Sequence, residues 1–310
     1  MDAVTFQHVS KSYRTTTAVA NLSLNIKQET VVALLGPNGA GKTTALSMTL
    51  GLTQPTSGTV TLLGQNPNQP RTRQRIGAML QEVTMPDKTS VTELVNLFRS
   101  YYEHSVNTNT LLELAQLTNL EGRPVRKLSG GQQRRLQFAL AMAGDPRILF
   151  LDEPTAGMDI TSRQGFWKTL RRFSETEGKT IVFSTHHLDE ADAAADRVLL
   201  LQNGRLIADG SPAELKTATG LRLITGSLDP KTNRTDLLAL PHLASLEWQG
   251  DRFTMRSTNS DETLRSLIQG DFSVRDIEVR GGGLEDAFVA LTMQNQQAQQ
   301  TQQAQEADIR

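Results

Sequence analysis

The segment Gly36-Pro-Asn-Gly-Ala-Gly-Lys-Thr43 decides the fold of this 310-residue chain. It matches the pattern G-x-x-x-x-G-K-[ST] and lies between an apolar run, 30–35, and a helix-like run, 43–52. Glycines let the backbone curl so that successive amides point inward, and the positive end of the following helix attracts anions. The segment therefore predicts a strand, a phosphate-binding loop and a helix.

This loop predicts ATP and Mg²⁺ as ligands. Lys42 is expected to reach the β- and γ-phosphates, and the hydroxyl of Thr43 is expected to bind Mg²⁺. The residues predicted to contact the nucleotide here are Gly36, Pro37, Asn38, Gly39, Ala40, Gly41, Lys42, Thr43 and Thr44.

A second apolar run, ILFLDEP at 148–154, reads as a strand that ends in two carboxylates, Asp152 and Glu153. Adjacent strand residues point to opposite faces, but a turn at the strand end can swing the second side chain into the site. Asp152 suits the Mg²⁺ shell. Glu153 is then free to act as the general base on the attacking water, so the pair predicts ATP hydrolysis.

Composition limits the partners of the chain. Thirty-two Lys and Arg against 33 Asp and Glu leave a formal charge of -1, so we expect no nucleic-acid partner. There is no cysteine for a disulfide framework, and the first residues lack a secretory signal pattern. The apolar runs fall far short of the roughly 20 residues that span a bilayer. We expect a cytoplasmic protein without direct membrane insertion.

The spacing of apolar residues along the sequence indicates how the chain is divided into domains. Up to about residue 215, short β-rich runs alternate with helical patterns, which predicts an α/β domain over 1–215. Between about 86 and 127 the strand signals stop and apolar residues take helical spacing, which predicts a helical insert.

The sequence after residue 215 has a different order of strand and helix patterns, which predicts a small α+β domain over 216–293. Strand, helix, strand, strand, helix and strand patterns follow one another, an order consistent with a ferredoxin-like domain. They lie near 221–226, 233–240, 243–249, 252–257, 261–268 and 273–279. The Gln-rich segment 294–310 has almost nothing to bury, which predicts disorder or a frayed helical extension.

A third motif, LSGGQ, stands at 128–132. A helix-capping role explains its serine. It does not explain two glycines in the opening turn, each of which costs about 1 kcal/mol relative to Ala unless something must approach the backbone closely. With this motif, residues 4 to 215 resemble the ATP-binding cassette (ABC) ATPase family. The resemblance implies a P-loop NTPase cassette with a mixed sheet and a helical insert.

The resemblance also implies roles for further residues. Tyr13 lies where the family stacks an aromatic ring on adenine, although an ordinary exposed tyrosine would look the same. Gln81 matches the glutamine that senses Mg²⁺ and the membrane partner, and His186 matches the histidine that contacts the γ-phosphate, with His187 as a helix-start residue. The implied catalytic residues are Lys42, Gln81, Glu153 and His186, the implied metal ligands are Thr43, Gln81 and Asp152, and the implied signature contacts are Ser129, Gly130, Gly131 and Gln132.

In this family, each ATP is enclosed by the phosphate loop of one subunit and the signature of another. One copy of each motif therefore implies a second nucleotide-binding subunit. We expect a homodimer, although the sequence does not show whether the second subunit is identical. Residues 155–159, TAGMD, resemble the loop that crosses the dimer, with Met158 where Leu is usual.

Three features point to one branch of the family. The single cassette carries no fused spans, the insert is present, and GGGLEDAF at 281–288 resembles the ending of drug-resistance export ATPases that pair with ABC-2-type permeases. The same string also fits a glycine turn before an amphipathic helix. We expect the motor of a separate permease that exports drugs, peptides or lipids, bound at the inner face of the cell membrane, with 86–102 docking on the permease.

The sequence also bears on two other functions known for ABC proteins. A soluble ABC protein acting on ribosomes or DNA usually carries two cassettes or a long coiled-coil insertion, and neither pattern is found here. An inert regulatory cassette usually loses Lys42, Glu153 or His186, and this sequence keeps all three.

Overall fold

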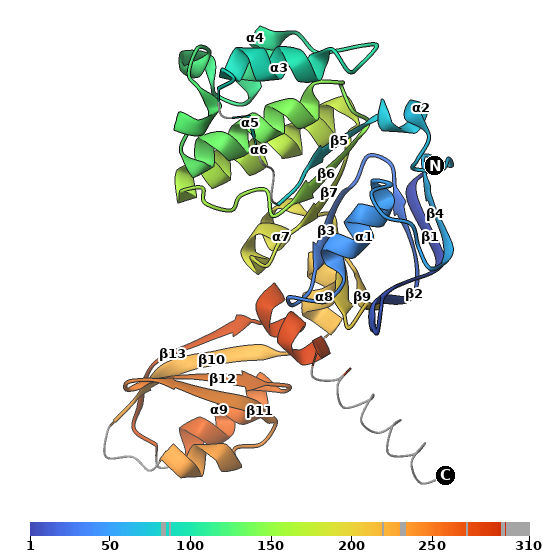
Figure 1. Ribbon diagram of the computed structural model, residues 1–310. Coiled ribbons are helices and arrows are strands. Elements are labelled where there is room, and N and C mark those ends of the chain that lie inside the picture. The colour runs from blue at the N-terminus through green and yellow to red at the C-terminus, as the bar shows by residue number, and fades with distance from the viewer. Residues whose placement is uncertain are drawn as a thin grey trace. The chain divides into compact units, whose positions relative to one another are not determined.

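The computed structural model divides the chain into two compact units, Met1–Asp209 and Gly210–Arg310 (Figure 1). It describes residues 1–81, 85–86, 88–218, 220–229, 234–270, 272–292 and 295. The division falls a few residues before the boundary expected at 215. Apart from residue 295, the segment 294–310 for which the sequence predicts disorder lies outside the described residues.

A six-stranded sheet, in the order β5-β6-β7-β3-β8-β9, forms the centre of the first unit. The pairs β5–β6, β6–β7, β7–β3 and β3–β8 are parallel. Every residue of β3, β6 and β7 is buried, which is the pattern of strands covered on both faces. The strands are β3 (Val31–Leu35), β5 (Ile76–Met79), β6 (Ile148–Asp152), β7 (Thr180–Ser184), β8 (Arg197–Gln202) and β9 (Arg205–Gly210).

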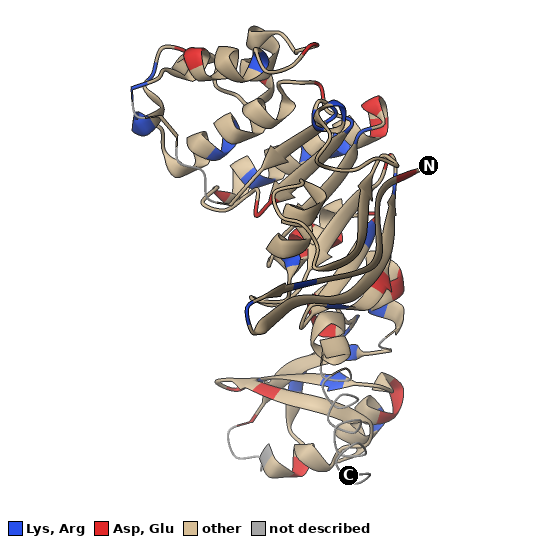
Figure 2. Cartoon of the chain, turned by 45° about the vertical axis from the view of Figure 1, so that its right-hand side comes forward, with Lys and Arg blue, Asp and Glu red and all other residues tan. Residues whose placement is uncertain are grey.

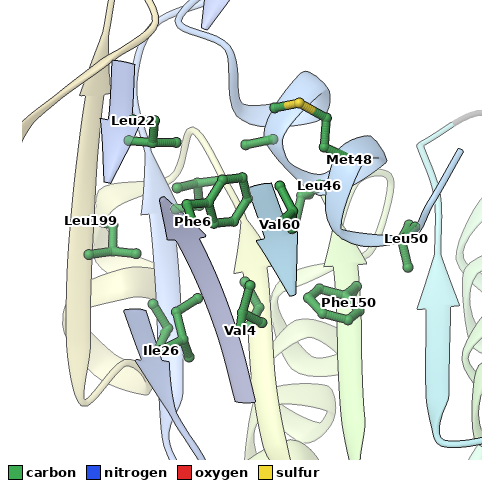
Figure 3. Packing of buried hydrophobic residues seen from close by; sticks show 14 of the residues in the cluster. Val4, Phe6, Leu22, Ile26, Leu46, Met48, Leu50, Val60, Phe150 and Leu199 are labelled. Atoms are coloured by element: carbon green, nitrogen blue, oxygen red, sulfur yellow. The ribbon is translucent and has the colours of Figure 1, made fainter. Parts of the chain in front are cut away.

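A three-stranded antiparallel sheet, in the order β2-β1-β4, packs beside the central sheet. Helix α1 (Lys42–Thr49) lies between the two sheets, and side chains from all three elements form one core cluster. Figure 3 shows Phe6 of the small sheet and Phe150 of β6 on either side of Leu46. The helix that follows the phosphate loop is therefore fixed from two sides. The strands are β1 (Asp2–Tyr13), β2 (Thr16–Lys27) and β4 (Ser57–Leu62).

Helices α5 (Gly130–Met142) and α6 (Ile160–Glu177) cover the β5–β6–β7 part of the central sheet (Figure 1). Phe138 of α5 meets Phe166 of α6 edge to face, with ring centroids 5.1 Å apart. Two short helices complete the layers, α2 (Pro70–Arg73) and α7 (Leu188–Ala194).

The segment between β5 and α5 is helical where it is described, in line with the helical patterns at 86–127. Helix α3 begins at a capping box in which the Ser90 hydroxyl and the Glu93 carboxylate satisfy each other's backbone N–H groups. The helices are α3 (Val91–Arg99), α4 (Thr108–Leu114), η1 (Thr118–Leu120) and η2 (Val125–Lys127).

The second unit contains a four-stranded antiparallel sheet in the order β11-β12-β10-β13. Its elements follow the β-α-β-β-α-β order read from the sequence, with a 3-10 helix in the first helical place. They are α8 (Pro212–Ala218), β10 (Arg222–Leu228), η3 (Arg234–Ala239), β11 (Leu243–Gln249), β12 (Arg252–Ser257), α9 (Ser260–Gln269) and β13 (Val274–Gly281).

In the GGGLEDAF string, Gly281 ends β13, Gly282 and Gly283 form a short connection, and a helix follows over 284–292. Asp286 is nearly buried and accepts hydrogen bonds from the backbone N–H of Gly283, at 2.8 Å, and from Nε of Arg256, at 2.6 Å. The carboxylate thus caps the helix and anchors it to β12. The local structure of this string is therefore that of a helix with an acidic first turn.

Figure 2 shows basic and acidic residues interspersed over each unit, as a formal charge of -1 leads one to expect. Among the described residues, no helix combines the length and the apolar character needed to cross a bilayer.

Candidate functional site

The phosphate loop, the end of β6 and Gln81 line one pocket of about 320 Å³. It lies at the carboxyl ends of β3 and β6, where open α/β sheets bind their ligands. The lining residues are Thr16, Thr17, Ala18, Asn38, Gly39, Ala40, Gly41, Lys42, Thr43, Thr44, Gln81, Asp152 and Glu153.

Two glycines of the loop cannot be replaced without strain. Gly36 and Gly41 have φ angles of 152° and 101°, which favour glycine. A Cβ added to Gly36 would lie 2.3 Å from the carbonyl oxygen of Leu201, and one added to Gly41 would lie 2.5 Å from that of Ala18. No side chain caps the start of α1. The loop therefore presents the positive end of α1 to the pocket.

Lys42 is folded over this loop. Its Nζ donates hydrogen bonds to the carbonyl oxygens of Gly36, at 2.6 Å, and Pro37, at 3.1 Å. Burial lowers the pKa of Lys42, and the charges of Glu153 and Asp152 partly offset this effect. The ammonium is thus held at the pocket between carbonyl dipoles and two carboxylates.

Asp152 is fixed by two hydroxyl groups. Ser184 donates to Oδ1, and Thr43 donates to Oδ2 at 3.4 Å. A carboxylate and a hydroxyl therefore converge in the pocket, and Gln81 lines the same space. Oxygen donors of this kind are those that Mg²⁺ prefers, so the residues present fit the metal that the sequence implies.

Glu153 has a left-handed backbone, with φ of 50°, directly after the extended Asp152. This conformation costs a non-glycine residue about 1–2 kcal/mol. Its N–H donates to the Ser184 hydroxyl at 3.1 Å. The turn brings two consecutive carboxylates to one pocket, as the sequence reading required.

The structure brings His186 to Glu153 and leaves His187 at a helix start. Nδ1 of His186 lies 2.8 Å from Oε2 of Glu153, and the imidazole is 60% exposed. His187 occupies the N-cap position of α7, and its N–H donates to the Thr185 hydroxyl at 3.0 Å. Of the two histidines, His186 is therefore the one that contacts the carboxylate.

Arg134 of α5 is a residue near the pocket to which the sequence assigns no role. Its Nη1 donates to the carbonyl oxygen of Leu80 and its Nη2 to that of Gln81, each at 3.0 Å. Burial lowers the pKa of Arg134, and Asp152 and Glu153 act in the opposite direction. Helix α5 thereby holds the Gln81 segment. Only a through-space contact reveals this role, because the two segments lie far apart in the sequence.

The signature residues do not join the pocket. None of 129–132 is among the described residues that line it. Ser129 instead begins α5 in a capping box with Gln132, whose N–H donates to the serine hydroxyl at 3.3 Å. Tyr13 does not line the pocket either, but it pairs across its hairpin with Thr16, which does.

Comparisons with known proteins identify the family. A family model described as ABC transporter matches residues 19–156. The Nod factor export ATP-binding protein I of Burkholderia lata is 36% identical over 304 residues, which cover 95% of this chain and 98% of the relative. The chain belongs to the ABC transporter family. It is an ATP-binding protein of that family, whose cassettes hydrolyse ATP.

Other relatives agree with this assignment. The protein of the same name from Neorhizobium galegae is 36% identical, over 94% of this chain and 85% of its own length. Among solved structures, a dimeric ABC cassette, MJ0796, bound to ADP and Pi has a TM-score of 0.63 and 27% identity, covering 67% of this chain and 98% of its own. The cbiO1 protein of Clostridium perfringens, part of an ABC transporter complex, has a TM-score of 0.61, 26% identity, and coverage of 70% and 91%.

Replacing Lys42 by Ala is expected to abolish tight ATP binding, because the pocket loses its ammonium while keeping two carboxylates that repel phosphate. Titration with a fluorescent ATP analogue measures the Kd, which should rise at least about 100-fold. Lys27→Ala, which removes an exposed ammonium at the end of β2, is the control. An unchanged Kd in Lys42→Ala would contradict the assignment of the loop.

Proposed function

We propose that this ABC ATPase is the nucleotide-binding subunit of an exporter, and that it dimerises around ATP to drive a separate ABC-2-type permease. The resemblance that runs the length of the chain supports this proposal, because relatives matched over 95% of it carry export in their names. The proposed cargo is of the drug, peptide or lipid type. The subunit would lie in the cytoplasm, bound to the inner face of the cell membrane through the permease, without a nucleic-acid partner.

We propose a division of labour along the chain. Residues 1–215 form the ATPase domain, with the helical insert at about 86–127, and residues 216–293 form an accessory α+β domain. The Gln-rich tail, 294–310, takes no part in the chemistry. Exposed Leu97 and Tyr101, at the end of α3, are apolar groups suited to the docking of 86–102 on the permease.

We assign nucleotide binding to 36–44, with Tyr13, which pairs with the pocket-lining Thr16, on the adenine. Lys42 neutralises charge on the β- and γ-phosphates. Mg²⁺, held by Thr43, Gln81 and Asp152, would supply further charge neutralisation on the phosphate oxygens. The residues of the chain provide the rest of the catalysis, mainly by positioning and electrostatics.

We assign proton transfer to Glu153, with His186 as its partner. A carboxylate oxygen of Glu153 takes a proton from the attacking water while the new oxygen–phosphorus bond forms and the bond to the ADP oxygen breaks. The contact of 2.8 Å between Nδ1 of His186 and Oε2 supports this assignment, because it leaves Oε1 for the water.

The signature helix supports the proposed dimer. A Cβ added to Gly130 would meet no heavy atom within 4 Å, so packing within this chain does not require glycine there. The signature residues Ser129, Gly130, Gly131 and Gln132 are also missing from the pocket lining. A γ-phosphate of an ATP molecule bound to the opposing subunit accounts for both observations. The dimeric cassette MJ0796, similar to this chain over 67% of its length, is in keeping with this arrangement.

Replacing Glu153 by Gln should preserve ATP binding and lower turnover by at least about 100-fold, because an amide does not accept the proton of water. The variant should accumulate as an ATP-bound dimer. Phosphate release and size-exclusion chromatography with ATP measure the two effects. Glu113→Gln, an exposed change on α4, is the control. Wild-type turnover in Glu153→Gln would exclude Glu153 as the base.

Replacing Gly130 by Ala should separate folding from assembly. The added methyl group meets open space within the chain and favours the helix, so the unfolding free energy should stay equal or rise by up to about 1 kcal/mol. In the Glu153→Gln background, the same change should weaken the ATP-dependent dimer. Gly165→Ala, which also adds a methyl group to open space on a helix, is the control. Undiminished dimerisation in Gly130→Ala would contradict the close approach of phosphate.

Purification from membranes tests the exporter proposal. A tagged chain, extracted from its own cells with mild detergent, should retain a protein with several membrane spans that mass spectrometry identifies. The Glu153→Gln variant, with ATP, should retain more of it. Recovery of ribosomal proteins or DNA in place of a membrane protein would favour the soluble ABC function weighed above.

A further inference from the structure

Glu190 of α7 is a buried carboxylate to which the assignments above give no role. Its side chain is nearly inaccessible, at 3% for the residue. Oε1 accepts a hydrogen bond from the Thr155 hydroxyl at 2.5 Å, and Oε2 accepts one from the Thr185 hydroxyl at 2.8 Å. Each oxygen of one carboxylate is therefore used by a different segment of the chain.

The two threonines stand next to the proposed catalytic groups. Thr155 follows Glu153 by two residues and begins the 155–159 segment, and its carbonyl oxygen accepts from the N–H of Met158 at 3.0 Å. Thr185 directly precedes His186. Both threonines are buried, at 2% and 1% exposure, so water does not compete for their hydroxyl groups.

The ion pair nearby does not explain this arrangement. Nε of Arg163 lies 3.4 Å from Oε1 of Glu190, yet among the described residues this nitrogen has no hydrogen-bond partner. The carboxylate is aligned with the two hydroxyl groups and not with the guanidinium. A buried carboxylate is costly unless its oxygens are satisfied, so it holds its two hydroxyl partners firmly in place.

We propose that Glu190 is a positioning residue that holds the segment after Glu153 and the segment before His186 in register. It thereby fixes the contact between His186 and Glu153. The two hydrogen bonds to Glu190, from Thr155 and Thr185, also couple the position of 155–159 to that of His186. A movement of 155–159 on dimer assembly would therefore shift the imidazole. This inference rests on the proposed roles of Glu153 and His186, and it adds Thr155, Thr185 and Glu190 to the parts that turnover depends on.

Three substitutions test the bridge in the full chain. Glu190→Gln removes the charge and one acceptor oxygen, and Thr155→Val removes a hydroxyl group at nearly constant volume. Each of these two variants should lower kcat about tenfold, while the Kd and the KM for ATP change less than about twofold. This combination is expected when catalytic groups are misplaced but ATP still binds. Thr155→Ser keeps the hydroxyl group and should restore most of kcat. Circular dichroism melts check that the variants fold.

Thr72→Val is the matched control for the loss of a buried threonine hydroxyl group. Thr72 is 2% exposed, and its hydroxyl donates to Oε1 of Gln65 at 3.3 Å. It has no assigned place in the catalytic or binding groups, so its kcat should stay within about twofold of the wild-type value. An equal loss of kcat in Thr72→Val and Thr155→Val would overturn the proposal.

A double-mutant cycle with His186→Ala distinguishes positioning from general support of the fold. Single-turnover ATP cleavage, with enzyme in excess, measures the small rates. If Glu190 acts through His186, then Glu190→Gln costs about tenfold in the wild-type background and less than about twofold in the His186→Ala background. An equal cost in both backgrounds would overturn this inference and leave the proposed function intact. Normal turnover in Glu153→Gln would instead overturn the proposed function, and this inference with it.

Discussion

The site depends on one constraint, the fixing of α1 between two sheets with its first turn open to the pocket. Leu46 and Met48 lie in a core shared by the antiparallel and parallel sheets, so the helix cannot tilt without opening both. Gly36 and Gly41 then let the chain reach this helix through a turn that other residues cannot adopt. The anion-binding end of α1 is therefore held by the core, and the pocket combines residues of the loop with residues of α1 and β6.

The parts of the site that lie together in the sequence could be predicted from it. The phosphate loop and the acidic end of β6 are short segments whose chemistry depends on neighbours along the chain. In the accessory unit, the order of strands and helices was readable because turns and alternating strands are local patterns. Its first helical segment, predicted at 233–240, is a 3-10 helix at Arg234–Ala239. The sequence did not show this, because the spacing of apolar residues does not distinguish a 3-10 helix from an α-helix over so few residues.

The parts that escaped prediction join segments that are distant in the sequence. Arg134 holds the Gln81 segment from 53 residues further along the chain, and Glu190 contacts Thr155 across 35 residues. The sequence around Glu190 does not indicate which residues donate hydrogen bonds to its carboxylate. The left-handed backbone of Glu153 was likewise hidden, since no glycine or asparagine marks the turn.

The contacts of Lys42 have a consequence for which ligands the pocket can select. The ammonium already has the carbonyl oxygens of Gly36 and Pro37 as acceptors, so binding a nucleotide is an exchange of partners and not a simple gain. Phosphate oxygens carry charge and make stronger hydrogen bonds than carbonyl groups, so the exchange favours a ligand that brings several of them within reach. Because the lysine of such a loop reaches the β- and γ-phosphates, a nucleotide without these groups would leave the ammonium on its own loop. The hydrogen bonds that Lys42 makes within the loop thus favour the binding of nucleotides with several phosphate groups over nucleotides with one.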